Sequence, residues 1–150
     1  MFKIAKIEAC AVAIPLKMPI KMSGILIETC DNLIVKITDS EGNVGWGEAS
    51  SAPTMTGETA EGLVAATKFM ADRLTGIEIT NHEGLVDLIE PLMHANHSAK
   101  SAIDGALHDL IGNRWCCTDL LLAALINPCA NVGFVAPPRS LQNWQAPRPC

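Results

Sequence analysis

The sequence predicts an α+β domain in which a three-stranded antiparallel meander is followed by a bundle of about three helices. Apolar and polar residues alternate through much of the first 50 residues, and apolar residues recur at helical spacing from about residue 60 onward. Strands that precede a group of helices are typical of α+β domains and not of alternating βα folds. At 150 residues, the chain is long enough for one such domain with a hydrophobic core.

Two long strands are expected first. One covers residues 3–14 and ends where Pro15 removes a backbone N–H from the ladder. The other covers residues 25–38. Cys10 and Cys30 lie in these strands and are expected to be small core hydrophobes. The side chains expected on the buried face of the second strand are Leu33, Val35 and Ile37.

A hairpin connection at residues 39–43, with Gly42 available for a positive φ, leads into a third strand over residues 44–49. Gly45 and Gly47 share one face of this strand. Strand glycines mark places where another group packs closely against the backbone, so we expect a close neighbour on this face.

Two loops carry exposed apolar side chains. The loop at residues 16–24 joins the first two strands, and the loop at residues 50–57 has Met55 as its one large apolar residue. Loops with apolar side chains often cover another part of a protein or a ligand. A loop packed against its own core would explain the pattern equally well. The apolar residues of the first loop are Met18, Ile20 and Met22.

Three helices are expected after the second loop. The first has an apolar stripe from Leu63 to Leu74 and ends at Gly76. A capping box at residues 80–83 opens the second, and Pro91 kinks or ends it.

The third helix has the strongest helical pattern in the chain. Asn96 is its expected cap, and Gly112 and Asn113 supply a left-handed stop. Lys100, Asp104 and His108 lie at i, i+4 spacing on what is expected to be a solvated face. The apolar stripe consists of Ala99, Ala102, Ile103, Ala106, Leu107 and Leu110.

Composition argues against several classes of partner. The formal net charge is −5 and no basic cluster is present, so neither nucleic acid nor an anionic membrane is expected to bind. No apolar run approaches the roughly 20 residues that cross a bilayer, so a cytoplasmic protein is expected. The six cysteines include no Cys-x-x-Cys pair and the four histidines are dispersed, so no metal site is expected in this chain.

Five motifs in order resemble the amino-terminal domain of the mandelate racemase/muconate lactonizing enzymes, within the enolase superfamily. The resemblance covers residues 1–114. The motifs are Lys3-Ile-x-x-Ile7, Asn32-Leu-Ile-Val-Lys-Ile37, Gly45-Trp-Gly-Glu-Ala49, Pro53-Thr-Met-Thr-Gly-Glu58 and Ala99-x-x-Ala-Ile-Asp-x-Ala-Leu-His-Asp-Leu-x-Gly112.

This resemblance implies a capping domain over a (β/α)-barrel that binds magnesium and abstracts a proton α to a carboxylate, in an isomerase, racemase or lyase. The two loops would close over a small carboxylate substrate, excluding water and selecting shape. Because the acid-base lysines and metal ligands of the family belong to the barrel, we expect no catalytic residue and no cofactor in this chain. Glu48, Asp104 and Asp109 are therefore expected to be structural. The residues expected to face the substrate are Met18, Ile20, Met22, Ser23, Thr54, Met55 and Thr56.

Residues 115–150 depart from the family pattern and are expected to be poorly ordered. A barrel needs roughly 200 or more residues, so the barrel domain is expected to be absent from this chain. Read one frame over, the codons for residues 115–128 permit the family's expected ending, so a frame change near Arg114 or Trp115 is one interpretation. A genuine alternative tail, with a helix over residues 119–126 and a disordered proline-rich end, is the other.

Two functional hypotheses follow. One is a capping domain that is inactive alone and self-associates through its exposed barrel-facing surface. The alternative is a free-standing binding module that holds a partner or an apolar ligand without catalysis.

Overall fold

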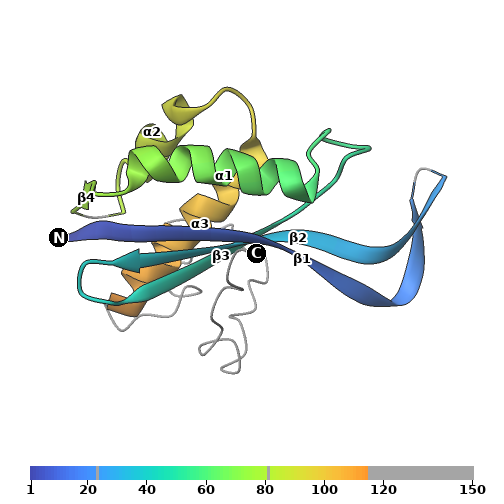
Figure 1. Ribbon diagram of the computed structural model, residues 1–150, viewed down its shortest axis with the longest axis horizontal. Helices are drawn as coiled ribbons and strands as arrows, with labels where there is room; N and C mark the ends of the chain where they lie inside the picture. Colours follow the sequence, from blue (N-terminus) through green and yellow to red (C-terminus); the bar gives the residue numbers. More distant parts are fainter. Residues whose placement is uncertain (23, 81, 115–150) are drawn as a thin grey trace, which may run out of the picture.

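The computed structural model describes residues 1–22, 24–80 and 82–114 as an antiparallel sheet packed against helices (Figure 1). α1 packs over β1, and α3 packs over β2 and β3. The α+β order is therefore confirmed. The elements are β1 (Phe2–Met22), β2 (Ile25–Asp39), β3 (Val44–Ser50), α1 (Ala60–Leu74), β4 (Glu78–Ile79), α2 (Leu85–Ile89), the 3-10 helix η1 (Glu90–Leu92) and α3 (His97–Arg114).

The sheet contains the predicted meander and one additional short strand. Its order is β3-β2-β1-β4. β4 pairs Ile79 with Phe2 and Glu78 with Lys3. Two residues are too few to show an alternating pattern, so β4 leaves no periodic signal in the sequence.

The prediction that the first strand ends at Pro15 is wrong. β1 and β2 stay paired beyond it, with Pro15 opposite Thr29 and, after a register shift, Ile20 opposite Ile27. In the alternation of the ladder, the Pro15 nitrogen points to the outer edge of β1, so its missing N–H removes no bond to β2. The expected loop is thus part of a β-hairpin that projects from the body of the domain (Figure 1).

The first two helices begin differently from each other. Thr59 caps α1, because its hydroxyl accepts the Gly62 N–H at 3.1 Å. The expected capping box of the second helix is wrong: α2 follows Gly84, which has φ 82°, and no side chain caps it. Pro91 lies in η1, directly after this short helix. A proline cannot continue the α-helical ladder, so the expected end of the helix near this residue is confirmed.

The N-terminus of α3 is held by a residue from another part of the chain. Glu58 Oε2 accepts from Ser98 Oγ at 2.5 Å, and Glu58 Oε1 accepts from Ser98 N at 3.4 Å. The expected cap, Asn96, instead donates its side-chain amide to the carbonyl of His94. The negative charge of Glu58 at the N-terminus of α3 also interacts favourably with the helix dipole.

The predicted stop at Gly112 and Asn113 is wrong, because α3 continues to Arg114. Its last residues are held by contacts with the β2–β3 hairpin. Asn113 Nδ2 donates to the Val44 carbonyl at 3.1 Å, and Arg114 Nη1 donates to Asp39 Oδ2 at 2.6 Å. Tertiary contacts thus carry the helix past a residue that would otherwise favour its end.

The solvated face predicted for α3 is wrong at Lys100, which is 5% exposed. Its Nζ donates to the Glu90 carbonyl at 2.9 Å and lies 3.0 Å from Glu90 Oε1. The ammonium therefore joins η1 to α3. Asp104 and His108, further along the same helix, are partly exposed, and Asp104 Oδ1 lies 3.5 Å from His108 Nδ1.

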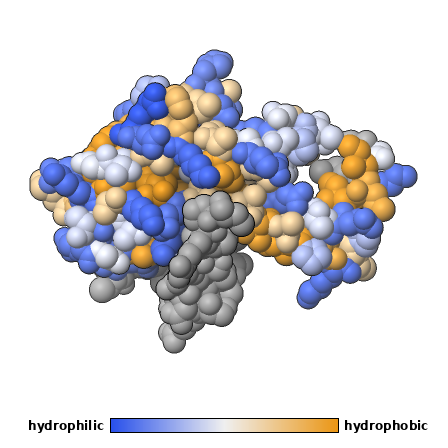
Figure 2. Space-filling model, in the orientation of Figure 1, coloured by the Kyte–Doolittle hydropathy of each residue, from blue (hydrophilic) through white to orange (hydrophobic). Residues whose placement is uncertain are grey.

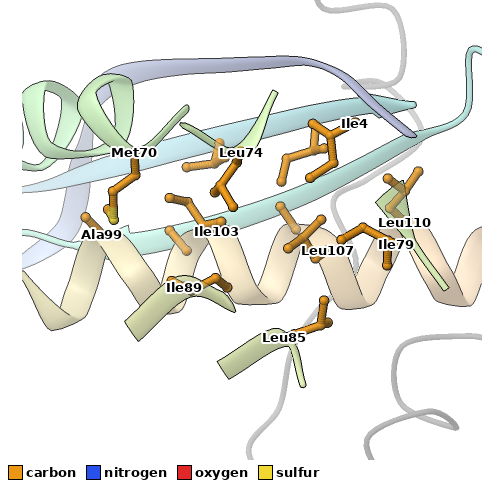
Figure 3. Close-up of a cluster of buried hydrophobic side chains, with 14 of the residues drawn as sticks. Ile4, Met70, Leu74, Ile79, Leu85, Ile89, Ala99, Ile103, Leu107 and Leu110 are labelled. Carbon is orange, nitrogen blue, oxygen red and sulfur yellow. The ribbon is translucent and has the colours of Figure 1, made fainter. Parts of the chain in front are cut away.

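The hydrophobic core lies between the sheet and the helices (Figure 3). The expected close approach at Gly45 and Gly47 is confirmed. A Cβ on Gly45 would overlap the Ala106 carbonyl oxygen, and a Cβ on Gly47 would overlap that of Ala102. The two glycines therefore let α3 lie directly against β3. Fully buried core residues include Leu33, Val35, Ile37, Leu63, Met70, Leu74, Ile103, Leu107 and Leu110.

Candidate functional site

The β-hairpin formed by residues 14–22 and 24–30, called the arm below, carries most of the exposed large apolar side chains of the described residues. β3 pairs with β2 only from Asn32 onward, so the arm is a two-stranded ribbon within the described part of the chain. Figure 2 shows apolar surface at its far end. Two-stranded ribbons are marginally stable without packing on a further element. The exposed apolar residues of the arm are Ile14, Met18, Ile20, Ile25 and Leu26.

Three of the expected substrate-facing residues, Met18, Ile20 and Met22, belong to the arm. Met18 is 78% exposed and Ile20 is 54% exposed. Met22 is the last residue of β1, and Ser23 lies outside the described residues. Ile27 and Leu33 are an even number of residues apart on β2, so their side chains lie on the same face of the sheet, the one that the helices cover. Ile20 lies opposite Ile27 and therefore shares this face.

The other three expected residues form the tip of the loop between β3 and α1. The Ala52 carbonyl accepts from the N–H groups of Met55 at 2.9 Å and Thr56 at 2.8 Å, which closes the loop into a tight turn. Met55 is 67% exposed, and Thr54 and Thr56 are also exposed. This loop and the arm extend toward the same end of the domain in Figure 1.

The base of the arm is tied to the start of this loop by a polar cluster. Asn32 is 8% exposed, and its Oδ1 accepts from Ser50 Oγ at 2.8 Å and from Cys30 Sγ at 3.0 Å. One residue further on, Ser51 N donates to the Asp31 carbonyl at 2.8 Å. Cys30 is thus half-buried in a polar contact, and the prediction that it is a core hydrophobe is wrong.

The end of the loop is also anchored. Glu58 N donates to Thr56 Oγ1 at 3.4 Å, and the Glu58 carbonyl accepts from Ala52 N at 3.1 Å. The Glu58 carboxylate then bonds to Ser98 at the start of α3. The loop is therefore held at both ends while its tip side chain, Met55, remains exposed.

The chemistry available at the two tips is steric and apolar. The charged residues of the arm are Lys17, Lys21 and Glu28, all exposed. Residues 52–57 have no ionisable side chain. A pair of positioned acid and base groups is what proton transfer requires, and the tips do not provide one. Apolar side chains on anchored segments instead suit the exclusion of water from a neighbouring site.

Two of the three carboxylates that are expected to be structural make contacts within the domain. Asp109 Oδ2 accepts the Trp46 N–H at 2.7 Å, joining α3 to β3. Asp104 pairs with His108 on α3, and Glu48 is exposed on β3. Sequence reasoning missed the anchoring roles of Asn32 and Glu58. Both depend on partners distant in the chain, for which no local spacing gives a signal.

Among residues 1–22, 24–80 and 82–114, no three His, Cys, Asp or Glu side chains are grouped so as to hold a metal ion. The same residues contain no helix with the length and apolar character of a membrane span. A surface hollow of about 330 Å³ lies beside η1 and shares no residue with the arm or the 52–57 loop. It is lined by Glu90, Pro91, Met93, His94, Ala95 and His97.

Comparison with known proteins places these features in a family. Residues 4–123 match the family described as mandelate racemase / muconate lactonizing enzyme, N-terminal domain. The match runs to residue 123, whereas the sequence motifs indicate a boundary at Arg114. The L-Ala-D/L-Glu epimerase of Bacillus subtilis is 34% identical over 108 residues, which are 71% of this chain and 30% of that protein.

Two further relatives show the same partial coverage. A chloromuconate cycloisomerase of Pseudomonas putida is 40% identical over 111 residues, covering 72% of this chain and 30% of that protein. The solved structure of a dipeptide epimerase from Enterococcus faecalis, complexed with Mg and the dipeptide L-Leu-L-Tyr, superposes with a TM-score of 0.66 at 30% identity. That superposition covers 75% of this chain and 32% of the epimerase.

This chain thus spans about 30% of the length of the curated relatives that it matches. The matched part contains the sheet, the arm, the 52–57 loop and the helices described above. The chain belongs to the mandelate racemase / muconate lactonizing enzyme N-terminal domain family of the enolase superfamily.

Proposed function

We propose that this chain is a capping domain that closes over a small carboxylate substrate bound by a barrel domain. The observation that carries the proposal is the exposure of Met18, Ile20 and Met55 on two segments whose bases are held by hydrogen bonds. The hydrogen bonds fix the positions of these segments, but the three apolar side chains are not packed into the hydrophobic core of the described residues. A substrate bound in an adjoining barrel would supply a surface for them to cover.

In this proposal the chain supplies shape and water exclusion, and residues outside it supply the proton transfer. The described residues do not form a magnesium site, so the metal seen with the Enterococcus relative would be bound by the barrel. Dipeptides and muconates are both acted on by relatives of this chain, and they share a carboxylate. The proposed substrate class is accordingly a small carboxylate.

The test is an assay of the purified chain for chemistry. We expect no magnesium binding by calorimetry and no α-proton exchange in D₂O on a panel of dipeptides and muconolactones. Exchange above the buffer background would contradict a purely capping role. Saturable binding of one panel member without exchange would favour the alternative, a free-standing binding module.

Self-association of the isolated chain is a second consequence of the proposal. The apolar tips that would face a barrel are exposed to water here, and such patches drive association. The triple variant Met18→Gln, Ile20→Gln, Met55→Gln should lower light scattering at high protein concentration. Val86→Gln, a change at a 63% exposed residue of α2, is the matched control and should not. Equal scattering by the two variants would count against the tips as the associating surface.

A further inference from the structure

The outer edge of β1 is unpaired over most of its length. β4 covers only Phe2 and Lys3, and Ile4 exchanges bonds with Ile77 and Gly76 at 3.0 and 2.8 Å. Beyond Ile4, no described residue makes a backbone hydrogen bond to this side of β1. An unpaired edge of this kind is a template for pairing with another strand.

The hydrogen-bond pattern identifies which groups face outward. Trp46 on β3 lies opposite Lys36 on β2, and the Trp46 N–H points away from β2, to Asp109. The backbone groups of Lys36 therefore point away from β3 and toward Glu8, its partner on β1. Bonded and non-bonded pairs alternate along an antiparallel ladder. The outward residues of β1 after its bulge near Lys6 are therefore Ile7, Ala9, Ala11 and Ala13.

The opposite edge of the same sheet is protected. On β3, the outward Trp46 N–H is taken by Asp109 and the Val44 carbonyl by Asn113 Nδ2, both from α3. Side chains that satisfy an edge strand prevent further pairing. The outward groups of Ile7 to Ala13 have no such cover among the described residues, which distinguishes the two edges.

We propose that the β1 edge from Lys6 to Ile14 pairs antiparallel with the same edge of a second copy of this chain, about a two-fold axis at Cys10. β4 bounds the free segment on one side, and Pro15, which has no N–H to donate, bounds it on the other. Cys10 lies midway between these bounds. A register centred there lets the whole free segment pair with itself.

The side chains are compatible with this register. Cys10 has inward backbone groups, so it would form a non-bonded pair with the partner's Cys10, the pairing in which side chains approach most closely. Glu8 would lie opposite the partner's Val12, and Ile7 opposite the partner's Ala13. The segment's charges, Lys6 and Glu8, cancel, and no like charges lie opposite each other. This self-complementarity favours a second copy over an unrelated strand.

The test uses the full chain and two prolines on opposite edges. Ala11→Pro removes an outward N–H from β1, and the matched Glu48→Pro removes an outward N–H from β3; neither breaks a ladder bond. Molar mass is measured by light scattering across a dilution series. Circular dichroism melts show whether each variant is folded. We expect at least a tenfold rise in the dimer dissociation constant for Ala11→Pro and no change for Glu48→Pro.

A second variant and a cross-link guard against misfolding. Ala11→Lys keeps the N–H but places two ammonium groups near each other across the axis, and it should also weaken the dimer. Burial raises the pKa of the Cys10 thiol, so oxidation is carried out at pH 8.5. Oxidised glutathione should accept the two electrons and protons as a Cys10–Cys10 disulfide forms. A monomer at all concentrations, a dimer unaffected by Ala11→Pro and Ala11→Lys, or cross-links that never include Cys10 would overturn the proposal.

Discussion

Arg114, the last residue of α3, donates from Nη1 to Oδ2 of Asp39 at 2.6 Å, although 75 positions separate the two residues in sequence. The Asp39 side chain is fully buried at the end of β2. It also accepts from the backbone of Glu41 and from the backbone and side chain of Asn43. One carboxylate thus closes the β2–β3 hairpin and holds the end of α3 against it.

Removing this carboxylate should destabilise the domain. Asp39→Ala leaves the Glu41 and Asn43 donors without their acceptor and Arg114 without its buried partner, so we expect a loss of about 2–4 kcal/mol. Urea unfolding followed by circular dichroism measures it. Glu41→Gln is the control, because that carboxylate is 59% exposed and should change stability by less than about 1 kcal/mol. Equal losses in the two variants would refute the central role of Asp39.

The same carboxylate should make stability depend on pH. Burial alone would raise the pKa of Asp39, but the hydrogen bonds from Asn43, Glu41 and Arg114 outweigh it and lower the pKa below its ordinary value. A lowered folded-state pKa gives stability that is present above about pH 4, the unfolded value, and lost as pH falls through the folded value. The advantage of the wild type over Asp39→Asn in urea melts should therefore shrink from pH 7 to pH 2.5. An advantage that stays constant would contradict this linkage.

The close packing of β3 on α3 predicts that Gly47 cannot be replaced. Gly47→Ala would place a Cβ against the backbone of Ala102, where only a shift of the helix can relieve the overlap. Overpacking of this kind typically costs about 1–3 kcal/mol. The neighbouring change Glu48→Ala, on the exposed face of β3, should stay within about 0.5 kcal/mol. Thermal melts of both variants decide the matter, and a neutral Gly47→Ala would mean that α3 is not held against β3.

The Glu58–Ser98 contact predicts a measurable coupling between the 52–57 loop and α3. Each single change, Glu58→Ala or Ser98→Ala, should cost about 1 kcal/mol, as the loss of a helix cap does. In a double-mutant cycle the double variant should cost less than the sum of the singles, because both remove one interaction. Strict additivity would show that the loop is not anchored through this pair.

Much of the fold follows from local pattern. Leu33, Val35 and Ile37 alternate as a half-buried strand must, and the stripe of α3 recurs at helical spacing, so both were predictable from period alone. Gly45 and Gly47, two strand glycines on one face, predict the close neighbour that α3 provides. These features depend on residues near each other in the chain.

The features that were not predictable depend on distant partners. Glu58 and Ser98 are 40 residues apart, and no spacing rule connects a loop glutamate to a later helix. Lys100 looks like a solvated residue by its i, i+4 spacing, but η1 folds over it. The exposure of Met18, Ile20 and Met55 was correctly indicated by their loop-like surroundings, although Pro15 concealed the fact that the first of these loops is a β-hairpin.

The capping role is tested most directly in a chimera in which residues 1–114 replace the matching domain of the Bacillus subtilis epimerase. The measurement is kcat/KM for dipeptide epimerisation by the chimera and by its Met18→Gln, Met55→Gln and Val86→Gln variants. The capping account predicts a loss of about tenfold, or ~1.4 kcal/mol, for each methionine variant and none for Val86→Gln. A folded chimera without activity, or methionine variants that keep the parent value, would contradict it.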